Sequence, residues 1–128
     1  MKRIYQICIV VIFLAVTCLS SPAQDRTDKE ELVFDFCYAL QASMVCKDLK
    51  MRIDTERKIE KKVGSKMRGP AAPYGNACHA GLDAEFADEN FENGNIKLCK
   101  KAWALYGCKG AKVPKLLYKI KGDYCVYE

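Results

Sequence analysis

One pair of residues in the sequence, His79 and Asp83, has the types and spacing of an acid–base catalyst. His79 is the only histidine of the chain, and Asp83 follows one helical turn later if the segment is helical. A histidine oriented by a carboxylate can serve as the base of a hydrolase. The sequence offers no nucleophile or metal ligand that can be assigned as a partner. We therefore do not expect an enzyme, and a secreted hydrolase that uses His79 is the second alternative.

Acidic residues are concentrated between Asp83 and Glu92, where two carboxylates could cleave a glycosidic bond. That chemistry requires a buried carboxyl group with a raised pKa, and the sequence gives no sign of such burial. We expect the acidic segment to be a solvated face or a complement to basic segments. The spacing of metal ligands is absent as well. We therefore expect no catalytic residue, no cofactor and no metal site.

Cysteine is the residue type with the clearest chemistry in this chain. The sequence has eight cysteines, of which Cys8 and Cys18 fall in the apolar N-terminal segment. The other six form an even set in a short domain, which is typical of three disulfides in an exported protein. Without a C-x-x-C pair, a zinc site is not expected. The predicted disulfide cysteines are Cys37, Cys46, Cys78, Cys99, Cys108 and Cys125.

The spacing of the cysteines limits how they pair. Nine residues along one helix place Cys37 and Cys46 about 13 Å apart on opposite faces, whereas a disulfide needs Cα atoms within about 7 Å. We therefore expect no Cys37–Cys46 bridge. Bridges between helices close longer loops and stabilise more, so we expect the first helix to be joined on both faces to the region of Cys78 or of the last three cysteines. A bridge between Cys99 and Cys108 stays open, because a glycine turn separates them.

Lysines and aromatic residues are interleaved in the last third of the chain, around the only tryptophan, Trp103. Such segments can bind anionic lipid, envelope polymer or nucleic acid. Nucleic acid is unlikely as a partner because the segment lacks arginine, which binds phosphate with two hydrogen bonds. We expect a protein or an anionic envelope polymer instead. The predicted interaction surface combines four of these lysines with two basic residues of an earlier charged segment: Lys109, Lys112, Lys115, Lys119, Arg57 and Lys61.

Residues 1–23 have the pattern of a secretory signal peptide. Two basic residues precede an apolar run, and small residues lie before the expected cut after Ala23. We expect residues 24–128 to form one domain, in the periplasm or secreted, with no transmembrane helix. The alternative is a lipid anchor on Cys18, although Thr17 before it fits that motif poorly.

Apolar residues recur at helical spacing through residues 29–63, and neither glycine nor proline interrupts them. The pattern predicts one long helix, or a helix that bends near Asp54-Thr55, where two weak helix formers meet. Thr27 or Asp28 can cap its start. Glycines and prolines then mark residues 64–76 as the main loop of the chain.

The remainder of the chain predicts two or three shorter helices. One begins at the cap residue Asn76 and ends near Asn93-Gly94, and the next runs from Asn95 to a left-handed Gly107. Pro114 suits the start of a short fourth helix. The residues of the third helix that we expect to face the core are Ile96, Cys99, Trp103 and Tyr106.

No segment shows the alternation of apolar and polar residues that predicts a strand. We expect the fold to be all-α, a small disulfide-cross-linked bundle of three to four helices in which the first helix is long. The expected function is that of a small exported, non-enzymatic interaction protein of the cell envelope. The first alternative is an envelope-acting toxin or its immunity protein, since such factors share this size, export and cysteine content.

Overall fold

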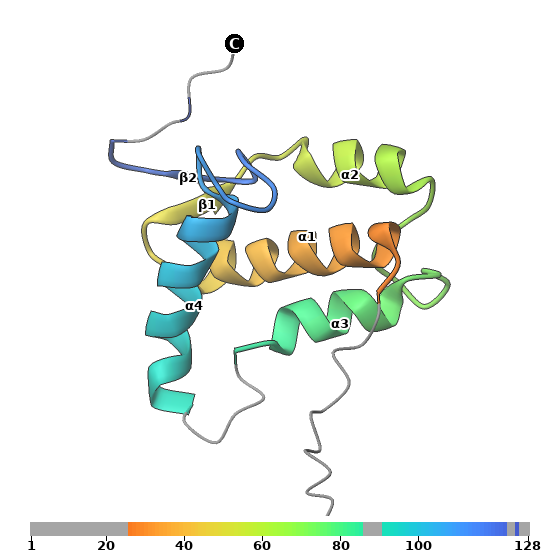
Figure 1. Cartoon of the computed structure of the whole chain (residues 1–128), viewed down its shortest axis with the longest axis horizontal. Coiled ribbons are helices and arrows are strands. Elements are labelled where there is room, and N and C mark those ends of the chain that lie inside the picture. Colours follow the sequence, from red (N-terminus) through yellow and green to blue (C-terminus); the bar gives the residue numbers. More distant parts are fainter. Residues whose placement is uncertain (1–25, 86–90, 123–124, 126–128) are drawn as a thin grey trace, which may run out of the picture.

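Helix α1 (Asp28–Val45) is the element against which the other elements pack (Figure 1). The computed structural model describes residues 26–85, 91–122 and 125. The helix begins as predicted, because Thr27 and Glu30 form a capping box. The Thr27 Oγ1 accepts a hydrogen bond from the Glu30 N–H, and the Glu30 carboxylate accepts one from the Thr27 N–H.

The first helix is long, with 18 residues, as predicted, but its predicted extent to residue 63, straight or bent, is wrong. The chain leaves the helix at Cys46, whose backbone is extended (φ −83°, ψ 121°). It then forms strand β1 (Leu49–Met51) before helix α2 (Thr55–Val63) begins. Helical spacing alone could not reveal this break, because the strand is stabilised by pairing with a segment near the end of the chain.

Helix α2 and the loop that follows it cover one side of α1. Ile59 and Val63, four residues apart, are both buried, and a left-handed Gly64 (φ 82°) ends the helix. The predicted loop after residue 64 is confirmed up to Tyr74. Its Met67 is fully buried, so the loop contributes to the core.

Helix α3 (Gly75–Asp83) lies along α1 and forms the most extensive contact with it (Figure 1). The contact is close at Gly81, where an added Cβ would lie 2.4 Å from the carbonyl oxygen of Phe34. The predicted start at Asn76 is nearly right, but the predicted end near residues 93–94 is wrong, since the helix ends at Asp83.

Helix α4 (Phe91–Tyr106) crosses the C-terminal part of α1 at a steep angle (Figure 1). It begins before the expected cap Asn95 and continues through Gly94, so the predicted helix break at residues 93–94 is wrong. It ends after Tyr106, as predicted. Gly107 is not left-handed; it is buried against Trp103, whose carbonyl oxygen would lie 2.6 Å from an added Cβ.

The segment expected to form a fourth short helix contains strand β2 (Leu117–Lys119) instead. It pairs antiparallel with β1, with Leu49 opposite Lys119 and Met51 opposite Leu117. The strands contain three residues each, too few to show alternation in the sequence. The described residues therefore form a mostly helical fold with a small two-stranded sheet, so the all-α prediction is correct only in part.

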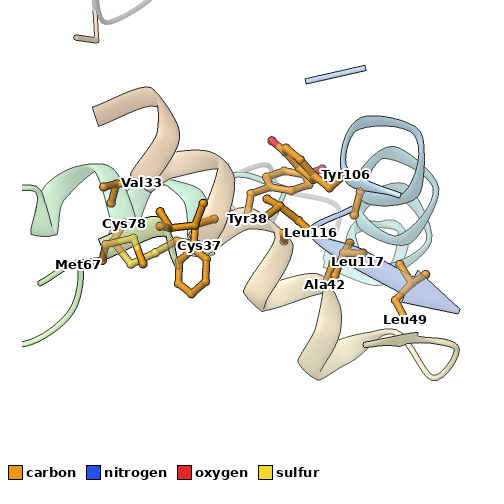
Figure 2. Close-up of a cluster of buried hydrophobic side chains, with 14 of the residues drawn as sticks. Val33, Cys37, Tyr38, Ala42, Leu49, Met67, Cys78, Tyr106, Leu116 and Leu117 are labelled. Carbon is orange, nitrogen blue, oxygen red and sulfur yellow. A yellow bond between two sulfur atoms is a disulfide. The ribbon is translucent and has the colours of Figure 1, made fainter. Parts of the chain in front are cut away.

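Three disulfides cross-link these elements, and their pattern confirms that no Cys37–Cys46 bridge forms. Cys37 of α1 is bonded to Cys78 of α3, beside the buried Met67 (Figure 2). The other two bridges join Cys46 to Cys99 and Cys108 to Cys125, so the alternative Cys99–Cys108 bridge is wrong. Among the described helices, none has the length and apolar composition needed to cross a membrane.

Candidate binding site

A hollow of about 360 Å³ lies beside Trp103, where α4 meets the end of α1 and the two strands. The half-buried Trp103 and the Cys46–Cys99 disulfide form part of its wall. The lining combines apolar groups with three lysines and one aspartate. Its residues are Cys46, Lys47, Asp48, Leu49, Cys99, Lys100, Trp103 and Lys119.

Two long-range connections assemble this hollow. The Cys46–Cys99 bridge, with a Cα–Cα distance of 5.8 Å, holds the end of α1 against α4. Pairing of the strands places Lys119 opposite Leu49, and the Ile120 N–H donates a hydrogen bond of 3.1 Å to the Asp48 carbonyl oxygen. Segments far apart in the sequence therefore meet at Trp103 through a disulfide and a backbone ladder.

The charged groups of the hollow are predominantly cationic. The Lys119 Nζ lies 4.4 Å from the centroid of the Trp103 ring, within the range of a cation–π interaction. Lys47 and Lys100 are exposed, and the structure shows no ion pair between either of them and another described residue. Asp48 is exposed as well, and it is the one acid in this lining.

Trp103 also lines a second hollow of about 360 Å³, together with Ala104, Cys108 and Lys109. Lys109 is exposed and forms no ion pair within the part of the chain that the structure describes. One aromatic ring is thus bordered by two hollows, each with at least one lysine. We call this region the Trp103 surface; its residues are Trp103, Lys47, Lys100, Lys109 and Lys119.

The predicted interaction residues divide between this surface and other places. Lys109 and Lys119 belong to the Trp103 surface. Lys112 does not, because its Nζ donates hydrogen bonds to the carboxylates of Glu31 and Asp35 on α1. Its role is to hold the segment after α4 against α1.

The other three predicted interaction residues do not line either hollow at Trp103. Lys115 is exposed and has a left-handed backbone (φ 66°). Arg57 and Lys61 are exposed on α2, which packs on a different part of α1 (Figure 1). The six residues proposed from sequence therefore do not form one surface around Trp103.

Sequence reasoning missed Lys47 and Lys100, although a signal was present. Both follow a cysteine directly, as Lys109 does, so the chain contains three Cys-Lys dipeptides. Once Cys46 is known to bond with Cys99, the two lysines must lie near each other. The sequence could not supply that pairing.

A buried carboxylate on the other side of α4 stabilises the fold. Glu85 is 6% exposed and accepts hydrogen bonds from the Tyr38 hydroxyl (2.9 Å) and the Lys101 ammonium (2.7 Å), with Lys97 at 3.2 Å. Burial by itself raises the pKa of Glu85, but these three donors outweigh it, and the pKa is below its ordinary value. Of the two expectations for the acidic segment, a solvated face or a complement to basic segments, Glu85 fits the second, because it pairs with Lys97 and Lys101. A lowered pKa is the opposite of what a general acid needs.

A second buried carboxylate, Asp35, is bound in the same way. The Tyr106 hydroxyl donates to it at 2.5 Å, and Lys112 donates at 2.9 Å. The rings of Tyr38 and Tyr106 lie next to each other, 5.6 Å between centroids (Figure 2). Burial first, and then the adjacent carboxylates, raise the pKa of both tyrosine hydroxyls, so they remain protonated donors at neutral pH.

Replacing Glu85 with glutamine should lower the free energy of unfolding at pH 7 by about 2 kcal/mol, because charge-assisted hydrogen bonds in a buried site are lost. The folded-state pKa of Glu85 is lowered, so its contribution is fully present above the unfolded value of 4.5 and is lost as pH falls through the lower folded value. Urea unfolding of the wild type and E85Q should therefore differ at pH 7 and converge as the pH falls below 4.5.

Asp54→Asn is the control, because Asp54 is an exposed acid paired with Lys58. A D54N effect equal to that of E85Q at pH 7 would contradict the assigned role of Glu85.

His79 and Asp83, the pair considered for catalysis, are both exposed on α3. Neither lines one of the hollows at Trp103, and the described residues show no hydrogen bond between them. No group of three or more metal-ligating side chains occurs in the described part of the chain. The hydrolase and the toxin or immunity hypotheses stay predictions from sequence.

Comparisons with known proteins add no relative to this description. No protein-family model, curated protein or solved structure matches the chain.

Proposed function

We propose that the protein is a small, non-enzymatic binding protein of the periplasm or the extracellular space, which holds an anionic partner on the Trp103 surface. The observation that carries this proposal is that the half-buried Trp103 lines two hollows, each of which has at least one lysine in its lining. A partly exposed indole offers a large apolar contact area. The lysines around it supply charge for an anionic group.

The distribution of the other lysines supports the proposal. Lys97, Lys101 and Lys112 form ion pairs with the carboxylates of Glu85 and Asp35. These lysines stabilise the fold. The lysines of the Trp103 surface form no ion pair with a described residue. Their positive potential is therefore opposed only by the exposed Asp48, the one acid that lines these two hollows.

The disulfides support the proposed compartment. Three disulfides are compatible with an oxidising environment, and disulfides are rare in the reducing cytosol. The predicted signal peptide of residues 1–23 would deliver the chain there. We propose binding without chemistry because a partly exposed indole beside lysines suits the recognition of an anionic partner.

Titration with a soluble polyanion tests the proposal, using heparin for sulfate groups and poly-L-glutamate for carboxylates. Trp103 is the only tryptophan, so its fluorescence reports on the site alone. We expect a saturable change in emission with at least one of the two. Replacing Lys47 and Lys100 with glutamine should weaken binding about tenfold, since each exposed charge contributes about 0.2–1 kcal/mol.

The matched control removes two exposed lysines of α2, Lys61 and Lys62, and changes the net charge by the same amount. K61Q/K62Q should bind within about twofold of the wild type. If neither polyanion changes the emission of Trp103, or if both double variants lose affinity equally, the Trp103 surface is not the binding site.

A further inference from the structure

The outer face of α4 carries an apolar and basic stripe that continues the Trp103 surface. Ile96, Cys99, Lys100 and Trp103 recur at intervals of three, one and three residues, which places them on one face of the helix. Ile96 is 63% exposed. The adjacent side of the helix packs in the core through Leu98, Ala102 and Tyr106. The stripe therefore exposes Ile96 and Lys100 to solvent, beside the partly buried Cys99 and Trp103, which also pack against the core.

The composition of this surface favours one class of anionic partner. Interfaces between proteins are enriched in arginine and depleted in lysine, but every basic residue of the Trp103 surface is a lysine. A soluble acidic polymer would pair with the lysines, yet it would leave Ile96 exposed to water. A bilayer with anionic headgroups can bind both the lysines and the aliphatic side chain. The lysines contact the headgroups, and the aliphatic group inserts at the boundary with the acyl chains.

Trp103 fits the same partner. Tryptophan is enriched at the boundary between headgroups and hydrocarbon, where its ring is apolar and its N–H stays hydrated. The two hollows that Trp103 lines are open to solvent, and headgroup phosphates could enter them beside Lys47, Lys100 and Lys109. Lys119 already lies over the indole, so one cation and the ring would reach the membrane together.

We propose that the Trp103 surface, extended by Ile96, docks on a lipid bilayer that contains anionic headgroups. This inference rests on the proposed function and specifies its partner. The protein binds at the surface as a peripheral protein: the lysines contact phosphates, and Ile96 and Trp103 insert at the depth of the acyl boundary. Binding is reversible and weakens as salt screens the lysine charges.

The test uses the exported, oxidised protein, without residues 1–23, and vesicles of palmitoyl-oleoyl phosphatidylcholine with 25% of the corresponding phosphatidylglycerol. We expect co-sedimentation with these vesicles, a blue shift of the Trp103 emission, and quenching by brominated acyl chains. The partition coefficient should fall about 25-fold for K47Q/K100Q, at about fivefold per lysine. Ile96→Ser should lower it about fivefold without affecting binding to heparin.

Controls separate this inference from the proposed function. K61Q/K62Q should partition within about twofold of the wild type, and vesicles of phosphatidylcholine alone should bind at least tenfold more weakly. Binding to heparin or poly-L-glutamate without binding to the anionic vesicles would overturn the lipid partner and leave the proposed function standing. Binding to vesicles in which brominated lipid does not quench Trp103, or in which I96S has no effect, would overturn docking through this face. Absence of binding to all probes would contradict both.

Discussion

Replacing Cys46 and Cys99 with alanine should lower the free energy of unfolding by about 4 kcal/mol. The bridge closes a sequence separation of 53 residues, and the entropy that a cross-link removes from the unfolded chain increases with that length. The variant also loses the connection that holds α1 against α4 beside Trp103. Guanidinium unfolding followed by far-ultraviolet circular dichroism measures the change, and the other two bridges are verified by peptide mass mapping.

The Cys108–Cys125 bridge provides the comparison, because its separation is only 17 residues. C108A/C125A should cost about 3 kcal/mol by the same argument. It should also leave the sheet and the hollow beside Lys100 intact. A smaller loss for C46A/C99A than for C108A/C125A would show that the former bridge is not the main link between α1 and α4.

The second large effect is expected at Gly81, where α3 contacts α1. An added Cβ would lie 2.4 Å from the Phe34 carbonyl oxygen and 3.0 Å from the Tyr38 amide nitrogen. Both are backbone atoms of a helix and cannot rotate away. Gly81→Ala should therefore separate the two helices, strain the Cys37–Cys78 bridge, and lower the free energy of unfolding by about 2–3 kcal/mol.

Gly75→Ala is the matched control on the same helix. A Cβ at Gly75 meets no atom within 4 Å, and the backbone there is not left-handed. Alanine has a higher helix propensity than glycine, so G75A should be neutral or stabilise the protein by up to about 1 kcal/mol. Equal destabilisation by the two substitutions in urea unfolding would contradict the close contact at Gly81.

Features encoded by neighbouring residues could be predicted from the sequence. The start of α1 follows from Thr27 and Glu30, three residues apart. The geometry of a helix was enough to exclude a Cys37–Cys46 bridge, and glycine and proline located the loop after α2. Each of these depends on contacts within a few residues.

Features that depend on distant segments could not be predicted. Neither glycine nor proline marks the break after Val45. The helix ends there because the following segment, at Leu49, pairs as a strand with residues 117–119, which are far away in the sequence. The end of α3 and the start of α4 were misplaced for a related reason. Asn93-Gly94 is a common helix stop, but here it lies within the first turn of α4, where glycine is tolerated.

Which face of α4 packs against the core could not be decided from the sequence. Two apolar stripes exist on this helix, and the one chosen from sequence contained Trp103 and Tyr106. In the structure, Tyr106, Leu98 and Ala102 of α4 are buried, and the Tyr106 hydroxyl donates a hydrogen bond to Asp35. The prediction that Ile96 faces the core is therefore wrong, because Ile96 is 63% exposed, whereas Cys99 and Trp103 are partly buried and pack against the core. A region expected to anchor the core is therefore the candidate binding site.

A single resonance tests the central claim that an anionic partner binds at the Trp103 surface. The one tryptophan gives one indole N–H signal in a ¹⁵N–¹H correlation spectrum. During titration with whichever of heparin and poly-L-glutamate changes the Trp103 emission, we expect this signal to shift in a saturable manner, together with the backbone amides of Lys47, Lys100 and Lys109. A saturable shift confined to α2, around Arg57 and Lys61, with an unchanged indole signal would contradict it.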